Sequence, residues 1–322
     1  MPVRLPPLTD RASRILLESL IDFAGLFPPA ELSMTAAVRQ FAHYRASGAG
    51  WMLGRFVCPV NALEAFSDAA DPLLPRDDRA IPWRLSVTAR GDAAGACEAI
   101  AAFNERHRVC FEECGAVVDM LELPASSVEE IAQIDAVVPR DLQVYCELPF
   151  GDELDTLVRA VAHSGRRAKM RTGGVTRAAF PTAESIAQFL RVCHQHEVPA
   201  KATAGLHHPL CGDYRLTYAT DAAHGPMFGF LNVLLAAALV RQRDTTDDLH
   251  ELIALLDDRD PTHFHVDDLQ VAWTGPYDTI TFDRATLHHL RTDSLVSIGS
   301  CSFTEPVDEA RALGWIPAAG AP

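Results

Sequence analysis

Short apolar runs alternate with stretches of helical spacing along most of the chain, and this alternation predicts the fold. Strands are predicted at 20–26, 51–58, 83–89, 117–123, 143–148, 168–172, 200–204 and 295–300. Helices are predicted at 35–47, 62–70, 93–106, 127–134, 153–163 and 183–196. The first seven strands begin 25 to 34 residues apart, which is the size of a strand–helix–strand unit. Eight strands that alternate with helices predict an α/β protein of the (β/α)8 TIM-barrel class.

The spacing between the last two predicted strands is unusually long. No linker rich in Pro, Gly or Ser divides the chain, so we expect one barrel domain over 1–322. The segment 209–294 is an insertion within it, with helix-like stretches at 228–241, 246–256 and 266–273. Insertions of this length are commonly lids, interface elements or small subdomains. The open-sheet alternative lacks the Gly-x-Gly-x-x-Gly turn of dinucleotide-binding folds.

Composition limits the classes of partner. The formal net charge of −15 argues against nucleic acid and anionic membranes as partners. The N-terminal stretch lacks the apolar core of a signal peptide, and the longest apolar run, 227–240, is too short to span a bilayer. The eight cysteines show no complete zinc spacing, although Cys110 and Cys114 lie four apart. We therefore expect a cytoplasmic protein with reduced thiols, while the sequence leaves open whether it forms a homo-oligomer.

Strand periodicity places several charged side chains inside the predicted barrel. Alternate residues of a barrel strand face the axis, and the others meet an apolar helix layer. The polar side chains expected inside are Arg55, Ser86, Thr88, Tyr145, Glu147, Lys169, Arg171, Lys201 and Thr203. In the fourth strand, one alternation turns Asp119 inward and the other turns Glu122 inward. Barrel active sites lie at the C-terminal ends of the strands, so height favours Glu122. This pocket suits a small molecule that bears a carboxylate or phosphate.

Lys169 and Lys201 occupy matching positions in neighbouring strands, and this pairing indicates amine chemistry. Burial disfavours the ammonium form, and a second cation nearby lowers the pKa further. An amine freed in this way attacks carbonyl compounds to form an imine. The plainer interpretation is that each lysine reaches the surface at a strand end and pairs there with a carboxylate.

Seven short phrases occur in the order in which a known family carries similar ones. They begin at Ile21, Phe56, Gly115, Gln143, Lys169, Lys201 and Ile298. The most specific are Lys169-Met-Arg-Thr-Gly173, similar to Lys-Thr-Ser-Thr-Gly, and Lys201-Ala-Thr-Ala-Gly205, similar to Lys-x-x-Gly-Gly. The chain thereby resembles class I, Schiff-base aldolases of the deoxyribose-phosphate aldolase type. It departs from them at Gln143, where the family has lysine, at Arg171, and in the Ala204-Gly-Leu-His turn that replaces Gly-Gly-Ile-Arg.

The resemblance implies a carbon–carbon lyase that needs no cofactor, because the iminium itself accepts electrons. It implies that Lys169 forms the imine, that Lys201 lowers the pKa of Lys169, and that Asp119 moves protons. Glu147, which the strand pattern turns inward, is a second candidate for proton transfer. The substrate, a small anionic carbonyl compound, is expected to meet Arg55, Arg171, Thr172, Gly173, Thr203, His207 and Ser300.

Two other functions remain open from the residues. Glu122, Glu147 and His207 together carry donors for a divalent metal ion, which predicts a metal-dependent barrel lyase or isomerase. His207 alone is a candidate acid or base, or a plain lid contact. The altered turn after the seventh strand also fits a barrel that has lost catalysis and serves as a binding protein.

Overall fold

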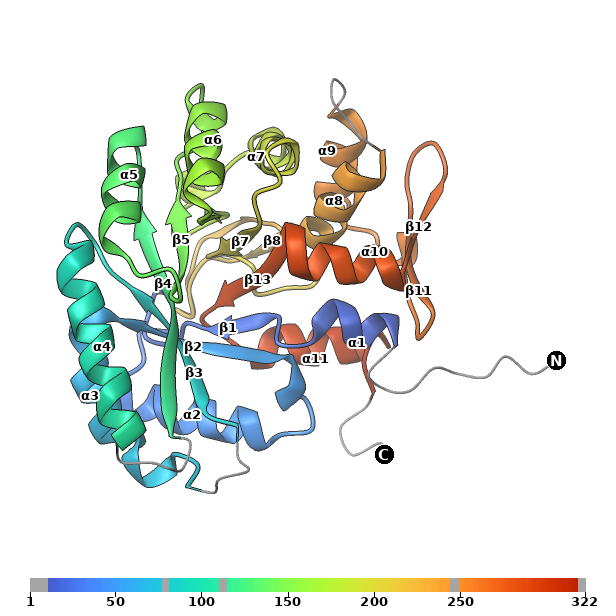
Figure 1. The fold of residues 1–322 in the computed structure, drawn as a ribbon. Coiled ribbons are helices and arrows are strands. Elements are labelled where there is room, and N and C mark those ends of the chain that lie inside the picture. Colours follow the sequence, from blue (N-terminus) through green and yellow to red (C-terminus); the bar gives the residue numbers. More distant parts are fainter. Residues whose placement is uncertain (1–10, 77–80, 110–114, 244–248, 318–322) are drawn as a thin grey trace.

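A computed structural model describes residues 11–76, 81–109, 115–243 and 249–317. Eight parallel strands close into a barrel in the order β1-β13-β7-β6-β5-β4-β3-β2, which confirms the predicted class (Figure 1). The strands are β1 (Ile21–Phe23), β2 (Leu53–Pro59), β3 (Trp83–Thr88), β4 (Ala116–Pro124), β5 (Gln143–Glu147), β6 (Arg167–Arg171), β7 (Ala200–Thr203) and β13 (Leu295–Ser300).

Helices surround the barrel and cover its outer face (Figure 1). They are α2 (Met34–Ala46), α3 (Leu63–Ala70), α4 (Ala93–Val109), α5 (Val128–Val137), α6 (Leu154–Ser164), α7 (Ala183–Gln195), α8 (Phe230–Arg243) and α11 (Thr304–Ala312). Ser33, Ser127 and Thr182 cap α2, α5 and α7 by accepting a backbone N–H from the first turn. Every residue of α8 from Phe230 to Val240 is buried, because this helix contacts α7, β13 and the next helix, α9 (His250–Leu256).

A bulge in β4 resolves the ambiguity of that strand. Leu85 pairs with Val118 and Ser86 pairs with Met120, so Asp119 is an extra residue in the ladder. The bulge shifts the alternation by one position. Asp119 consequently contacts the inward-facing Arg55, and Glu122 contacts the buried lysines of β6 and β7. Both proposed alternations occur, one on each side of the bulge.

The insertion of 209–294 contains strands as well as helices. Its elements are β8 (Gly212–Arg215), β9 (His224–Met227), α8, α9, β10 (Phe264–Val266), β11 (Gln270–Thr274), β12 (Thr279–Asp283) and α10 (Arg284–His289). The prediction of a helix over 266–273 is wrong. Asp267 accepts hydrogen bonds from the backbone N–H groups of Leu269 and Gln270, which builds a turn between two antiparallel strands. The predicted helix over 246–256 begins at His250, and part of that range lies outside the described residues.

The insertion lies at two different ends of the barrel. Tyr218, between β8 and β9, contacts Glu305 just after β13, so this hairpin lies at the C-terminal ends of the strands. In contrast, β11 contacts α1 (Ala12–Leu17), which precedes β1, and β12 contacts α10, which precedes β13. The sheet β10–β12 therefore lies beside the N-terminal ends of the strands (Figure 1). Of the segment expected to form a lid, the hairpin 212–227 is the part near the mouth.

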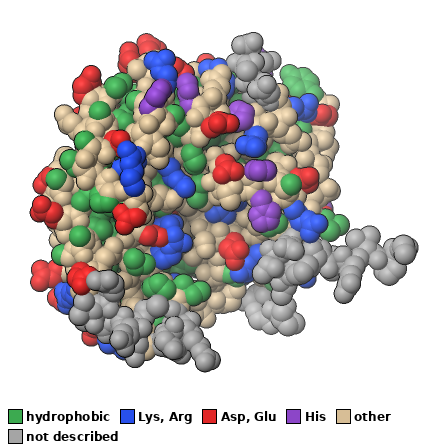
Figure 2. Space-filling model, in the orientation of Figure 1, with side chains coloured by type: hydrophobic (Ala, Val, Ile, Leu, Met, Phe, Trp, Pro, Cys, Tyr) green, Lys and Arg blue, Asp and Glu red, His purple; other side chains and the backbone are tan. Residues whose placement is uncertain are grey.

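Charges of both signs are interspersed on the face of the molecule shown in Figure 2. No helix within the described ranges combines the length and the apolar character needed to cross a membrane. Cys110 and Cys114 lie outside the described residues.

Candidate functional site

A cavity of about 810 Å³ opens at the C-terminal ends of the barrel strands. Its charged and titratable lining residues are Arg90, Glu122, Glu147, Lys169, Arg171, His207 and Cys301. They come from the ends of β4, β5 and β6 and from the loops after β3, β7 and β13. The cavity therefore lies where barrel folds carry their active sites.

Lys169 projects from β6 into the wall of this cavity. Its Nζ lies 2.6 Å from Oε2 of Glu122 and 2.7 Å from Oε2 of Glu147. The Lys169 side chain is 8% exposed and that of Glu147 is 28% exposed, so Glu147 is the more accessible partner. A small molecule in the cavity thus reaches the ammonium group and a carboxylate together.

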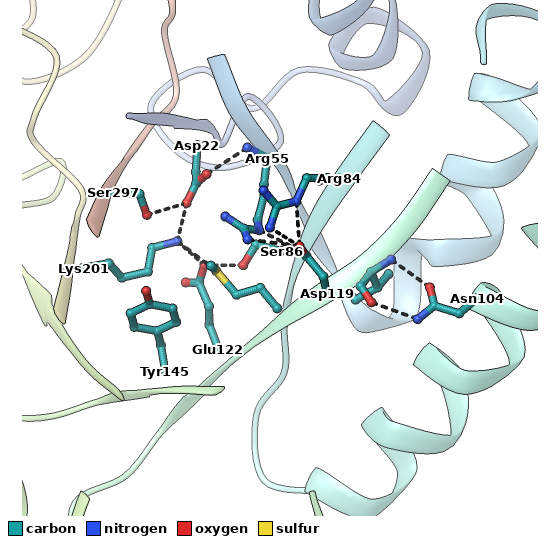
Figure 3. Close-up of polar contacts among 12 residues, drawn as sticks. Asp22, Arg55, Arg84, Ser86, Asn104, Asp119, Glu122, Tyr145, Lys201 and Ser297 are labelled. Atoms are coloured by element: carbon teal, nitrogen blue, oxygen red, sulfur yellow. Dashed lines mark hydrogen bonds and ion pairs between the residues drawn. The ribbon is translucent and has the colours of Figure 1, made fainter. Parts of the chain in front are cut away.

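Lys201 lies deeper in the barrel, with its side chain only 1% exposed (Figure 3). Its Nζ lies 2.7 Å from Oδ2 of Asp22 and 2.7 Å from Oε1 of Glu122, and it lies 5.6 Å from the centre of the Tyr145 ring. Among the described residues that line the cavity, Lys169 appears and Lys201 does not. The structure therefore separates the two lysines, one at the cavity wall and one beneath it.

Glu122 joins the two lysines through its two oxygens. Burial by itself raises the pKa of a carboxyl group, but the ammonium groups of Lys169 and Lys201 outweigh it and hold the pKa of Glu122 well below its usual range. Burial likewise favours a lower pKa for Lys201, and the carboxylates of Asp22 and Glu122 overcome it and raise that pKa. These directions show that both groups are charged in the resting site.

This electrostatic balance differs from the arrangement expected for an activating lysine. Three carboxylates, Asp22, Glu122 and Glu147, surround the ammonium groups of Lys169 and Lys201. Since Asp22 and Glu122 neutralise the charge of Lys201, its effect on Lys169 is screened. The expected role of Lys201, to lower the pKa of Lys169, stays a prediction that these contacts do not favour.

The charge pairing continues toward the N-terminal end of the barrel (Figure 3). Asp22 also accepts the backbone N–H of Arg55 at 2.8 Å, and the Arg55 guanidinium donates to Asp119 at 2.7 Å. Asp119 accepts a further bond from Arg84. Asp119 and Arg55, expected as proton shuttle and anion ligand, are therefore paired with each other, and neither is among the described residues that line the cavity.

The expected substrate-binding residues have different surroundings. Thr203 and Arg171 line the cavity. The hydroxyl of Thr172 donates to the carbonyl of Ala204 at 2.6 Å and ties the end of β6 to that of β7. The ring of Phe180 covers Gly173, since a Cβ built on this glycine would lie 2.5 Å from the ring. The structure thus gives Thr172 and Gly173 roles in shaping the loop.

His207 belongs to a polar cluster on the other side of the mouth. Its Nδ1 lies 3.0 Å from the Ser300 hydroxyl and 4.0 Å from Oε2 of Glu305, and Cys301 Sγ lies 3.8 Å from its ring. Burial, together with the charge of His208, lowers the pKa of His207 to about 4, so the ring is neutral near pH 7. Burial raises the pKa of Cys301 to about 11, which keeps its thiol protonated.

The proposed metal ligands are not assembled as a group. Glu122 and Glu147 meet at Lys169, whereas His207 contacts Ser300 and Cys301. Within the part of the chain that the structure describes, no three His, Cys, Asp or Glu side chains are grouped so as to hold a metal ion. His208, next to His207, stacks on Tyr214.

Sequence reasoning missed Asp22, Arg90, Cys301 and Phe180. Asp22 carried a usable signal, because it is a single carboxylate within the apolar stretch Leu20-Ile-Asp-Phe23. A charged residue in a buried strand needs a partner of opposite charge. Arg90 and Phe180 lie in loops, where periodicity predicts no direction for a side chain.

Comparisons with known proteins give low similarity. No family model matches the chain, and no curated protein matches it. An amidohydrolase from Burkholderia ambifaria with bound zinc is 10% identical, with a TM-score of 0.27, over 63% of this chain and 69% of that one. The spore cortex-lytic enzyme SleL of Bacillus cereus is 9% identical, with a TM-score of 0.36, over 92% of this chain and 73% of that one. The geometry of the site is therefore the basis for a function of this chain.

Proposed function

We propose that this chain is a barrel enzyme that forms an imine between Lys169 and a small anionic carbonyl compound. One observation carries the proposal. The chain contains only two lysines among its 28 basic Lys and Arg residues, so 28 − 2 = 26 are arginines. Both lysines lie in the barrel, at paired positions of β6 and β7. A guanidinium supplies a positive charge equally well, but only an amine forms an imine.

The contacts of Lys169 support a specific order of steps. The ammonium transfers a proton from Nζ to the carboxylate of Glu147, which leaves a neutral amine. The amine attacks the substrate carbonyl carbon, and the carbinolamine hydroxyl leaves as water with the proton that Glu147 returns, which gives the iminium. Electrons from a breaking C–C or C–H bond then flow into the iminium, with Glu147 in position to exchange the proton.

Lys201 and Arg171 have distinct parts in this proposal. When Lys169 loses its charge, Glu122 keeps the ammonium of Lys201 as its partner, so the buried carboxylate stays ionised. Lys201 is therefore a positioning residue. Arg171 follows Lys169 by two residues on the same strand and lines the same cavity, where its guanidinium suits a carboxylate or phosphate.

Reductive trapping tests the proposal directly. The folded protein is incubated with pyruvate, glyoxylate or dihydroxyacetone and with borohydride, and the adduct is mapped by mass spectrometry. We expect one adduct, on Lys169. Since the chain has two lysines, a mass shift leaves only Lys169, Lys201 and the N-terminal amine as candidates.

Two matched variants separate reactivity from charge. Lys169→Arg keeps the cation and should lose the adduct, while Lys201→Arg should retain it on Lys169. Thermal denaturation of each variant confirms that it is folded. An adduct that maps to Lys201, or its persistence in Lys169→Arg, would refute the assignment.

A further inference from the structure

A second cavity, of about 890 Å³, adjoins the reaction cavity on the side of α5. It is bounded by the loops that follow β3, β4, β5 and β6. The two cavities share Leu123, Pro124, Glu147 and Arg171. Arg171 and Glu147 line both spaces, so the two cavities adjoin at these side chains, next to Lys169.

Apolar side chains form part of the walls of the second cavity. They include Ile134 and Leu148, both buried, and the rings of Phe150 and Phe180. The Phe180 ring packs against Gly173 and Gly205. A Cβ on Gly205 would lie 2.8 Å from the ring, and a Cβ on Gly173 would lie 2.5 Å from it. The ring therefore packs directly against the backbone of both glycines and forms part of the cavity wall.

Three acidic side chains line this cavity: Glu147 pairs with Lys169, and Asp92 and Glu130 are engaged in helix caps. Glu130 accepts hydrogen bonds from the backbone N–H and the hydroxyl of Ser126 at 2.6 and 2.9 Å, and Asp92 accepts the backbone N–H of Gly95 at 2.8 Å. Arg171 remains at the junction as the cation facing both spaces. The second cavity therefore suits an uncharged, apolar chain whose anionic end stays at Arg171.

We infer that the substrate is a 2-oxo acid with an apolar chain, and that the chain occupies the second cavity. The inference rests on the proposed imine function. Lys169 and Arg171 lie two residues apart on one strand, so an adjacent carbonyl and carboxylate are engaged together. The rest of the molecule then extends past Arg171 between Leu148 and Phe180.

A binding series without imine chemistry tests the chain assignment alone. The probes are 2-hydroxybutanoate, 2-hydroxyhexanoate and 2-hydroxyoctanoate, which carry no carbonyl for Lys169, and binding is measured by titration calorimetry. We expect affinity to rise about fourfold per added methylene, as for burial of a CH₂ group. Ala178→Trp fills the cavity from its exposed wall and should abolish this rise.

Val175→Trp is the matched control, because Val175 is exposed on the same loop and is not among the described residues that line either cavity. It should leave the rise intact. Affinity independent of chain length in the unmodified protein, or a rise that survives Ala178→Trp, overturns the inference.

Borohydride trapping with the matching 2-oxo acids tests the imine proposal separately from the assignment of the apolar chain to the second cavity. An adduct on Lys169 with 2-oxobutanoate, without any gain for longer acids in either assay, overturns the chain assignment and leaves the imine proposal standing. A chain-length rise for the hydroxy acids, without any adduct, overturns the imine proposal and with it the assignment to 2-oxo acids.

Discussion

Asp22 holds three polar groups while its own side chain is fully buried. It accepts the Lys201 ammonium at 2.7 Å, the Ser297 hydroxyl at 2.9 Å and the Arg55 backbone N–H at 2.8 Å. A buried charge is tolerated only when its partners replace the lost water. Asp22 therefore keeps Lys201 charged, and through it Glu122.

Asp22→Asn should destabilise the protein by about 3–5 kcal/mol, because the change leaves the charge of Lys201 undercompensated in the interior. Urea denaturation followed by circular dichroism measures the free energy of unfolding. Asp68→Asn is the control, since Asp68 forms an exposed pair with Arg106 at 3.5 Å, and such pairs contribute about 1 kcal/mol or less. Equal losses in the free energy of unfolding for the two substitutions would show that the buried network contributes no more to stability than an exposed ion pair.

At the scale of elements, the regular part of the fold was predictable. The eight barrel strands and the first six predicted helices follow from apolar periodicity, because a parallel sheet covered by helices imposes it on every strand. The prediction for 266–273 was wrong because a run of only eight residues fits helical and strand spacing about equally well. The turn at Asp267 favours the strands.

The site was predictable only in part for a similar reason. Periodicity assigned Lys169, Lys201 and Glu147 to the interior, where the structure has them. The bulge at Asp119 is invisible in the sequence, since an extra residue in a ladder leaves no mark in composition. The packing of the Phe180 ring against Gly173 and Gly205 depends on contacts between two loops, which the local sequence does not predict.

The Phe180 ring packs against glycines in the loops after β6 and β7, and Gly205→Ala tests whether this packing stabilises the loops. Gly205 has φ of +76°, and a Cβ there would lie 2.8 Å from the Phe180 ring and 3.2 Å from Gly173 Cα. A left-handed backbone costs a residue with a Cβ about 1–2 kcal/mol, and the clash adds to it. We expect a loss of roughly 2–3 kcal/mol in the free energy of unfolding.

Gly48→Ala is the control for this substitution, because a Cβ at Gly48 has no atom within 4 Å. Its effect on unfolding should be within about 0.5 kcal/mol. In addition, Gly205→Ala should displace the Phe180 ring and weaken the chain-length dependence of hydroxy-acid binding. If Gly205→Ala is as stable as the parent protein, the ring is not held by the glycines.

For the molecule as a whole, the titratable groups of the interior set the pH range of stability. Alternating charges run from Arg84 through Asp119, Arg55, Asp22, Lys201, Glu122 and Lys169 to Glu147. The folded-state pKa of Glu122 is lowered, so its stabilising effect is present above its unfolded pKa of about 4.3 and is lost as pH falls below. The folded-state pKa of Lys201 is raised, so its stabilising effect is present below its unfolded pKa of about 10.4 and is lost as pH rises above that value.

His207 adds a separate dependence at mildly acidic pH. Its pKa is about 4 in the folded protein against the ordinary value of 6.5, so between these pH values the unfolded chain binds more protons. The free energy of unfolding should therefore rise with pH across this window, by roughly 3 kcal/mol in total, and level off above pH 6.5. Urea denaturation at half-unit steps from pH 4.5 to 8 measures the slope.

His207→Asn should flatten this slope, because asparagine does not titrate and its amide is able to bond to the Ser300 hydroxyl. His263→Asn is the control of opposite sign. The His263 side chain is 43% exposed, and its hydrogen bond to Asp258 raises its pKa, so its stabilising effect is present at acidic pH and is lost as pH rises. This substitution should keep the slope between pH 4.5 and 6.5 or steepen it. If His207→Asn leaves the slope unchanged, a group other than His207 takes up the proton when the protein unfolds. In that case the neutral imidazole at the mouth is not the cause of the acid sensitivity.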